Sequence, residues 1–366
     1  MRLRANEQKI VDACRFCWMC RHVCPVGNAT GQERNNARAR ALSLSLLSRG
    51  QSLTRDQVEN IYECALCGAC TGDCATGFDP TRFVKAARAE AAAEGLTPGP
   101  VVRILERMKR SGNPYGAVAL APVLEEEISS LPSKAPILLY LGSSARYQTP
   151  EAAVTAIRLL KKAKVDFTVM RDEPDSGLYK VNLLGPVAEA REDLVRAAEL
   201  INSTGAETLV AYSPSSAKAF LRDYPELNVP LFPQIRTFTS YLNTLIQKGA
   251  LVPTKGEISV TYHDPCALSR DLEEVDCARE ILGACGLLSE MFLHGKDTSC
   301  CGSGLMDLYA PQITEQTSTA RWSDAQRTGA QVLVTACPSC YTVFAKTKPE
   351  GMRLCSIETV LFEACK

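Results

Sequence analysis

Through residues 1–120 the apolar positions recur at helical spacing, and turn-forming residues separate the apolar stretches. Thr54 and Gln57 form a capping-box pair ahead of a stretch at 58–62, which indicates the start of a helix. Two further helices are expected to begin at Pro80 and Pro100, because proline is favoured in the first turn of a helix. Residues 1–120 are therefore predicted to form a mostly helical domain.

Beyond residue 136 the pattern changes to short apolar runs that alternate with helical stretches. The segment before them, 121–136, carries three prolines and three consecutive glutamates and is predicted to be a linker. Buried parallel strands covered by helices give this alternation, so the predicted fold class is α plus α/β. Strands are expected at 137–141, 165–170, 207–212, 258–262 and 331–335, and helices from 150 and at 186–202, 271–285 and 338–345.

The α/β region reads as two repeated halves, 137–250 and 251–366. The motifs that follow corresponding strands line up at nearly constant offsets of 122 to 125 residues. The second half has cysteine at five positions where the first half has serine or aspartate. Ser144, Asp175, Ser176, Ser213 and Ser216 stand where the second half has Cys266, Cys300, Cys301, Cys337 and Cys340. We therefore expect a metal site in the second half and no metal in the first.

The overall composition excludes several classes of function. Lys plus Arg equals Asp plus Glu, at 41 each, so nucleic-acid binding has no support. No apolar run approaches the roughly 18 residues that span a bilayer, and residues 1–13 hold no apolar signal segment. The 17 cysteines are therefore expected to be metal ligands in a reducing compartment, the cytoplasm, with any membrane contact made through partners.

The first fifty residues are basic, with a net charge of +6. Three interpretations remain open: the charge offsets anionic clusters, it faces an acidic redox partner, or it is a solvated face. The positive residues are Arg2, Arg4, Lys9, Arg15, Arg21, Arg34, Arg38, Arg40 and Arg49.

The spacing C-x2-C-x2-C-x3-C occurs twice, which is the ligand pattern for two [4Fe–4S] clusters. The strings are Cys14, Cys17, Cys20, Cys24 and Cys64, Cys67, Cys70, Cys74. In two-cluster ferredoxins the last cysteine of each string serves the other cluster. Cluster one is thus assigned to Cys14, Cys17, Cys20 and Cys74, and cluster two to Cys64, Cys67, Cys70 and Cys24. A pair of zinc sites is the alternative.

The five cysteines of the second half form another ligand set, at loops that follow strands. Cys337-Pro338-Ser339-Cys340 is a C-x-x-C at a strand-to-helix turn, where helix N-terminal amides lower the pKa of a thiol. The adjacent Cys300 and Cys301 suit neighbouring irons better than a mutual disulfide.

With these residues in view, the chain resembles the cysteine-rich (CCG) domain family of iron–sulfur proteins. Its members include the catalytic subunit of heterodisulfide reductase, the iron–sulfur subunit of glycolate oxidase and the C subunit of anaerobic glycerol-3-phosphate dehydrogenase. The residues that carry the resemblance are Cys266, Cys300-Cys301-Gly302 and Cys337-Pro338-Ser339-Cys340. It implies a noncubane [4Fe–4S] cluster at the five cysteines, hereafter the CCG site; structural zinc on four thiolates is the alternative. The first half would then be a degenerate CCG domain.

His263 precedes the CCG cysteine Cys266 by three residues. It is interpreted either as a proton donor beside the cluster or as a strand-end histidine held by backbone contacts.

No glycine-rich dinucleotide motif follows any strand, so flavin is expected on a partner dehydrogenase. The predicted function is an electron-transfer subunit of a multi-subunit flavin-dependent oxidoreductase that relays electrons through two cubanes to the CCG site and on to an acceptor such as quinone. The alternative is a thiol–disulfide reductase with the CCG cluster as its catalytic centre.

Overall fold

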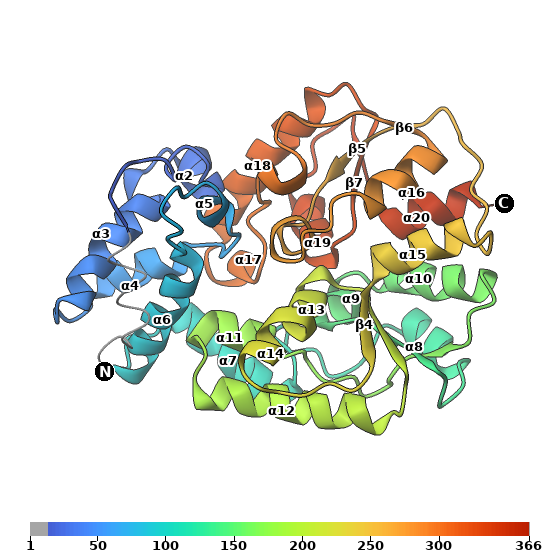
Figure 1. Cartoon of the computed structure of the whole chain (residues 1–366), viewed down its shortest axis with the longest axis horizontal. Helices are drawn as coiled ribbons and strands as arrows, with labels where there is room; N and C mark the ends of the chain where they lie inside the picture. Colours follow the sequence, from blue (N-terminus) through green and yellow to red (C-terminus); the bar gives the residue numbers. More distant parts are fainter. Residues whose placement is uncertain (1–13, 366) are drawn as a thin grey trace.

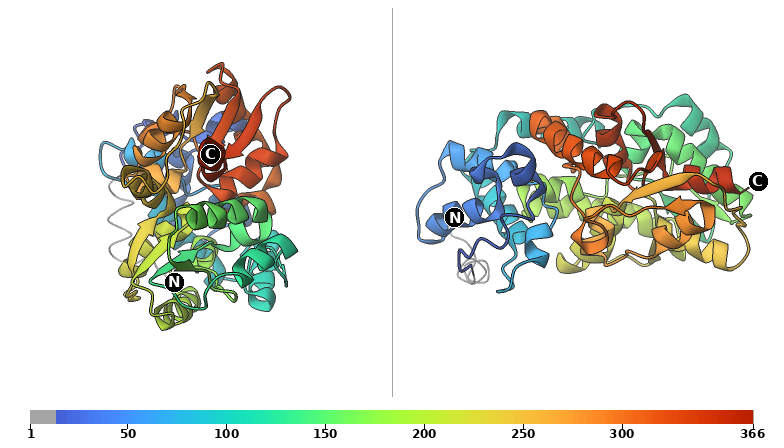
Figure 2. Two further views of the ribbon diagram at one scale, coloured as in Figure 1. Left: turned by 90° about the vertical axis from the view of Figure 1, so that its right-hand side faces the viewer. Right: turned by 90° about the horizontal axis from the view of Figure 1, so that it is seen from above.

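The computed structural model describes residues 14–365 and resolves them into a helical module and two α/β halves. Figure 1 shows the helical module at one end of the long axis and the two halves stacked beside it. The right-hand view of Figure 2 places the module at the same end, with helix α20 (Ile357–Ala364) toward the other. Arg2, Arg4 and Lys9 of the predicted basic segment, and the absence of a signal segment in 1–13, lie outside the described residues.

The N-terminal module is helical, as the sequence predicted. The capping box is present: the Thr54 hydroxyl accepts from the Gln57 N–H, and the Gln57 side chain accepts from the Thr54 N–H. The helices are α2 (Pro25–Thr30), α3 (Ala37–Ser48), α4 (Arg55–Tyr62), α5 (Ala69–Gly72), α6 (Pro80–Ala93) and α7 (Gly99–Ser111).

The segment 121–136 is more than the linker that the sequence predicted. Half of it forms α8 (Pro122–Ser129), which packs on the first α/β half. Leu124 and Ile128, one helical turn apart, are buried in the core of the α/β halves. The three glutamates that suggested a linker include Glu127, which pairs with Arg158 and Lys161 on α10 (Pro150–Lys162), each at 2.6 Å. The prolines and charges therefore mark a surface helix that belongs to the first half.

Each α/β half is built on a four-stranded sheet in which every pairing is parallel. The strand orders are the same, β2-β1-β3-β4 in the first half and β6-β5-β7-β8 in the second. The strands are β1 (Ile137–Tyr140), β2 (Phe167–Thr168), β3 (Thr208–Ala211), β4 (Gln234–Thr237), β5 (Ser259–His263), β6 (Leu287–Leu288), β7 (Val332–Thr335) and β8 (Arg353–Ser356). The mixed fold with parallel sheets matches the predicted class.

Helices cover both sheets, as buried parallel strands require. The helix expected at 271–285 begins only at Cys277, because Ala267–Asp271 forms a separate π-helical turn after Cys266. The remaining helices are α9 (Ser143–Gln148), α11 (Leu178–Leu184), α12 (Ala188–Ser203), α13 (Pro214–Lys218), α14 (Tyr224–Glu226), α15 (Phe238–Gln247), α16 (Cys277–Cys285), α17 (Met306–Tyr309), α18 (Pro311–Gln326) and α19 (Pro338–Lys346). One buried apolar cluster contains residues of both sheets, so the two halves share a core.

The helical module docks on the first α/β half through close backbone packing. The Tyr62 hydroxyl donates to the Leu183 carbonyl at 2.7 Å, and Arg88 donates to the Asn182 carbonyl at 2.6 Å. Gly185 adopts φ +74°, and a Cβ there would lie 2.9 Å from the Cβ of Ala89 on α6. Lys85 on α6 pairs with the buried Asp223 at 3.4 Å. These contacts hold the module in one position against the α/β halves.

Candidate metal centres

The two cysteine strings fold into loops of the same conformation. Phe16 and Trp18 in the first loop, and Leu66 and Gly68 in the second, all have positive φ, between 52° and 74°. Three of these four residues are not glycine, so the left-handed backbone is costly and is held by the surrounding loop. A tight loop of this kind turns successive thiols toward one point, as a cluster requires.

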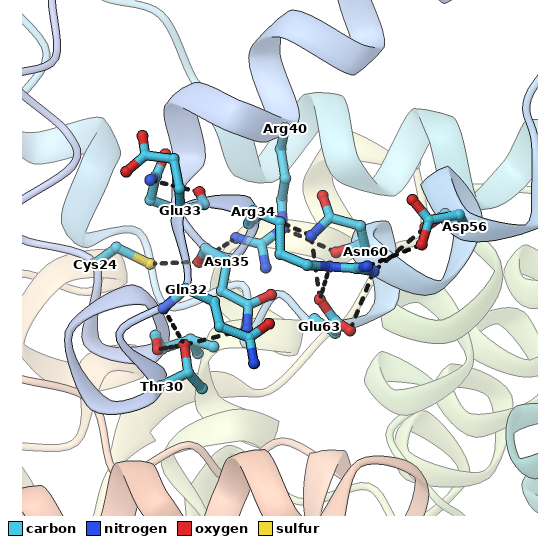
Figure 3. A network of polar contacts seen from close by, with 12 residues as sticks. Cys24, Thr30, Gln32, Glu33, Arg34, Asn35, Arg40, Asp56, Asn60 and Glu63 are labelled. Atoms are coloured by element: carbon cyan, nitrogen blue, oxygen red, sulfur yellow. Dashed lines mark hydrogen bonds and ion pairs between the residues drawn. The ribbon is translucent and has the colours of Figure 1, made fainter.

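The four thiols predicted for cluster two line one pocket. Cys24 comes from the first string and Cys64, Cys67 and Cys70 from the second, so the crossed assignment agrees with the pocket lining. Arg40 lines the same pocket, and Figure 3 shows it beside Cys24, in a polar network that continues to Asn60 and Glu63. A pocket whose polar lining consists of four thiols, a guanidinium and the hydroxyl of Thr81 suits an anionic iron–sulfur cluster.

The four thiols predicted for cluster one also lie near one another. Burial, together with the charges of Cys14, Cys74 and Cys17, raises the pKa of Cys20 to about 11. This group lies nearer the surface than the cluster-two thiols, since Cys17 is exposed whereas Cys24 and Cys67 are buried. The cluster-one loop therefore faces solvent.

The five cysteines of the second half converge at the carboxyl edge of its sheet. The neighbouring thiols of Cys266 and Cys301 raise the pKa of Cys300, and those of Cys301 and Cys337 raise the pKa of Cys340, so the five thiols lie close together. Four of the five are buried, and the fifth, Cys266, is partly buried. Such a set of buried thiols with few other partners has the donor chemistry of an iron–sulfur or zinc site.

His263 lies at this site and is fixed by a side chain that the sequence did not single out. Arg321 Nε donates to His263 Nδ1 at 3.3 Å, so the neutral ring carries its proton on Nε2. Burial lowers the pKa of His263. Its Nε2 is buried with no hydrogen-bond partner, and a ring nitrogen lies within 4.8 Å of the sulfurs of Cys301 and Cys340. The geometry favours a fixed N–H donor; the role of proton donor stays a prediction.

The corresponding positions of the first half are occupied by a closed hydrogen-bond network. Asp175 accepts from the Ser143 hydroxyl at 2.5 Å and from the Gly177 N–H at 2.9 Å. The N–H groups of Leu141 and Gly142 donate to Glu173. Burial raises the pKa of Asp175 to about 6 and that of Glu173 to about 7.

The serines of the first half are packed against its own backbone and against the second half. A Cβ at Gly142 would lie 2.9 Å from the Ser216 hydroxyl and 3.1 Å from the Ser213 Cβ, so this backbone approaches both serines closely. The Ser144 hydroxyl shares hydrogen bonds with the hydroxyls of Tyr115 at 2.7 Å, Tyr179 at 2.6 Å and Ser339 at 2.8 Å. Ser339 belongs to the C-x-x-C of the second half, so the first half supports the loop of the CCG site.

The CCG site also touches a thiol of cluster two, which the sequence did not predict. A hydrogen bond with Cys300 lowers the pKa of Cys67, a predicted cluster-two ligand. Arg270, four residues after Cys266, donates from Nε to the Cys67 carbonyl at 2.7 Å. Sequence spacing could not predict this contact between Cys67 and Cys300, because it depends on how the helical module packs against the second α/β half.

Three other cysteines, Cys285, Cys355 and Cys365, are buried among apolar side chains and take no part in these groups. Within the described residues no helix is long and apolar enough to cross a membrane.

Comparison with known proteins identifies both cysteine regions. Residues 10–78 match the family model described as a 4Fe-4S dicluster domain, and residues 260–345 match the model described as a cysteine-rich domain. The class of protein follows: the chain is an iron–sulfur protein that joins a dicluster domain to a cysteine-rich domain. The resemblance to CCG proteins inferred from the sequence is confirmed.

Among particular relatives, the chain is similar to the D subunit of the dihydromethanophenazine:CoB–CoM heterodisulfide reductase of Methanosarcina acetivorans, with 25% identity over 92% of this chain and 89% of that protein. It is 28% identical to the "Probable membrane-anchored ferredoxin" of Chromohalobacter salexigens, over 80% of this chain. It is 26% identical to the EtfAB:quinone oxidoreductase of Syntrophomonas wolfei, over 81% of this chain. The chain spans only 45% and 44% of the length of these last two relatives.

Proposed function

We propose that the chain is the electron-transfer subunit of a flavin-dependent oxidoreductase, and that it relays electrons through two cubanes to a cluster at the CCG site and on to an acceptor such as quinone. The observation that carries the proposal is a continuous series of neighbouring thiols. It runs from the exposed Cys17 loop through Cys20 and Cys70 to Cys67 and Cys300. When bound, the clusters supply one-electron carriers along this series.

The proposed ligand sets follow from the groups described above. Cluster one would use Cys14, Cys17, Cys20 and Cys74, and cluster two Cys64, Cys67, Cys70 and Cys24. The CCG site would hold a noncubane [4Fe–4S] cluster on its five cysteines, in a second half that duplicates the first. Metal analysis distinguishes iron from zinc there: about twelve irons per chain supports the cluster, and about eight irons with one zinc contradicts it.

The flavoprotein partner is proposed to dock at the cluster-one loop. Trp18 and Met19 are 48% and 47% exposed at the tip of this loop. Arg38 and Arg21 lie over the Trp18 ring, at 3.5 and 5.5 Å from its centroid. An exposed aromatic side chain ringed by arginines suits a partner with an acidic rim.

The test is anaerobic affinity purification of the chain from its native host, followed by reduction with the substrate of the co-purified flavoprotein. We expect a flavoprotein to co-purify and to reduce the cubanes, as followed by EPR. The variant Arg21→Glu should weaken the association, whereas Arg171→Glu, an exposed position on the first half, should not. Purification without any flavoprotein would contradict the proposal.

A second candidate function is a thiol–disulfide reductase, favoured by the similarity to the D subunit of heterodisulfide reductase over 92% of the chain. Here the CCG site itself would bind a disulfide substrate. The test is reoxidation of the reduced protein by disulfides, with Cys300→Ser as the control. A reoxidation rate that does not depend on disulfide excludes this candidate.

A further inference from the structure

Two buried arginines beside the cluster-two thiols leave the same terminal nitrogen, Nη2, without a hydrogen-bond partner. The first is Arg40 on α3, which is 2% exposed and lines the pocket of the four thiols. Its Nε and Nη1 donate to the carbonyls of Asn60 and Asn35, both at 2.9 Å (Figure 3). Its Nη2 is buried and has no hydrogen-bond partner.

The second is Arg270, which stands between cluster two and the CCG site. Its Nε donates to the Cys67 carbonyl at 2.7 Å, and its Nη1 donates to the carbonyls of Thr298 and Lys296, at 2.6 and 3.1 Å. Its Nη2 is again buried without a partner. Burial by itself would lower the pKa of Arg270, but the charges of Cys67, Cys266 and Cys300 raise it. One guanidinium therefore neighbours thiols of both sites.

In both arginines, Nε and Nη1 are anchored on backbone carbonyls and the terminal Nη2 is left unpaired, whereas the buried Arg88 and Arg146 leave only the inner Nε unpaired. A buried N–H of a charged group costs free energy when it has no acceptor, so an unpaired Nη2 among cysteine thiols suits an acceptor that a thiol-bound cluster would supply. Thiolate-bound iron–sulfur clusters are anionic and offer sulfur acceptors. Within residues 14–365, cluster one has no such arginine, because its nearby Arg38 is partly exposed and stacks on Trp18.

We infer that Arg40 and Arg270 are positioning residues that present fixed N–H donors and positive charge to cluster two, and that Arg270 serves the CCG site at the same time. The inference rests on the proposed function, since it requires iron at these thiols. Positive charge and hydrogen bonds to cluster sulfur stabilise the reduced state and raise the reduction potential. Electrons would then reside on cluster two in preference to cluster one, next to the CCG site.

The test is an EPR-monitored redox titration of the full chain, purified anaerobically with its iron. Arg40→Gln should lower the midpoint potential of cluster two alone. Arg270→Gln should lower the potentials of both cluster two and the CCG site. We expect a roughly tenfold change in the oxidised-to-reduced ratio, about 59 mV for a one-electron couple. The control is Arg146→Gln, which removes a buried arginine of the first half and should leave every potential unchanged.

A cluster-two potential that stays unchanged in iron-replete Arg270→Gln would overturn the inference, as would an equal shift in Arg146→Gln. If Arg270→Gln loses iron, Arg270→Lys is tested next, because lysine keeps the positive charge but lacks the guanidinium that bonds several acceptors at once. If Arg270→Lys keeps its iron and a near-native cluster-two potential, the inference is supported. If Arg270→Lys also loses iron, the inference is overturned, because Arg270 then serves only to hold the backbone carbonyls that it binds. A wild-type protein without a CCG-site signal would contradict the proposed third cluster, while the cluster-two shifts would still test both arginines.

Discussion

The two α/β halves share one strand order, yet the same edge of the sheet is filled in two different ways. In the second half, the edge gathers five thiols and the unpaired Nε2 of His263. In the first half, Asp175 and Ser144 at corresponding positions are bonded to Ser143, Tyr179 and other protein groups. The comparison teaches that the fold brings side chains together at the carboxyl edge of each sheet. Whether that edge suits a metal depends on whether those side chains still have ligand atoms free of protein partners.

The largest effect is expected when the second half is made to resemble the first. The double variant Cys337→Ser/Cys340→Ser reproduces Ser213 and Ser216, and hydroxyls are poor ligands for iron–sulfur clusters. We expect complete loss of metal at the CCG site, about four irons per chain if it holds a cluster, with both cubane EPR signals retained. Elemental analysis measures this loss. Cys285→Ser, at a buried cysteine outside the sites, should keep all metal.

The next effect tests the closed packing of the first half. Gly142→Ala places a Cβ 2.9 Å from the Ser216 hydroxyl on a backbone with φ +82°. We expect the free energy of unfolding to fall by about 1–3 kcal/mol, as measured by chemical denaturation. Gly205→Ala also has a positive φ, but nothing lies within 4 Å of its Cβ, so it should cost less. Equal losses would show that backbone strain alone accounts for the cost.

The buried carboxyl of the first half should make its stability depend on pH. The pKa of Asp175 is raised to about 6 from an ordinary value of 3.8, so the folded state binds more protons between these values. Stability contributed by the neutral carboxyl is therefore present below pH 4 and is lost as pH rises through about 6, by at most roughly 3 kcal/mol.

Hydrogen exchange of first-half amides, corrected for intrinsic rates, should show this loss between about pH 4 and pH 6. Asp175→Asn should reduce the slope and leave the part that comes from Glu173, whose pKa is raised to about 7, whereas Asp166→Asn, at an exposed position of the same half, should preserve the full slope. A wild-type protection profile that rises with pH over this window would reverse the expected sign.

The smallest effect concerns the hydroxyl network that joins the halves. Tyr179→Phe removes a hydroxyl bonded to Ser144 at 2.6 Å and to Ser339 at 3.2 Å. Each serine has another partner or can rotate, so the loss should be about 1 kcal/mol in thermal unfolding. Metal content at the CCG site should stay the same. Loss of that metal would instead mean that Tyr179 is required to hold the C-x-x-C loop.

Much of this architecture was predictable because strong local patterns specify it. The capping box at Thr54 and the buried strands β1, β3, β5 and β7 were placed within about two residues. Strands β4, β6 and β8 were missed, since edge strands of two to four residues are too short to show an apolar pattern of their own.

The candidate metal centres, too, were predictable only in part. Cysteine spacing predicted which thiols lie together, because a cluster requires several thiols on one short loop. Arg40, Arg270 and Arg321 carried no comparable signal in the sequence. Their positions depend on the docking of distant segments, such as Arg270 on the Cys67 loop. Such contacts arise from tertiary packing, which local patterns in a single sequence do not predict.

The close packing of Gly185 against helix α6 has a consequence for the rate at which electrons would move within the molecule. Some redox proteins carry a cofactor on a domain that swings between donor and acceptor, so that diffusion of the domain paces each cycle. Here the contacts of Gly185, Tyr62 and Arg88 seat the helical module directly on its neighbour. If the chain relays electrons as proposed, the distances between its clusters are set at folding, and its internal transfer rate should not depend on solvent viscosity.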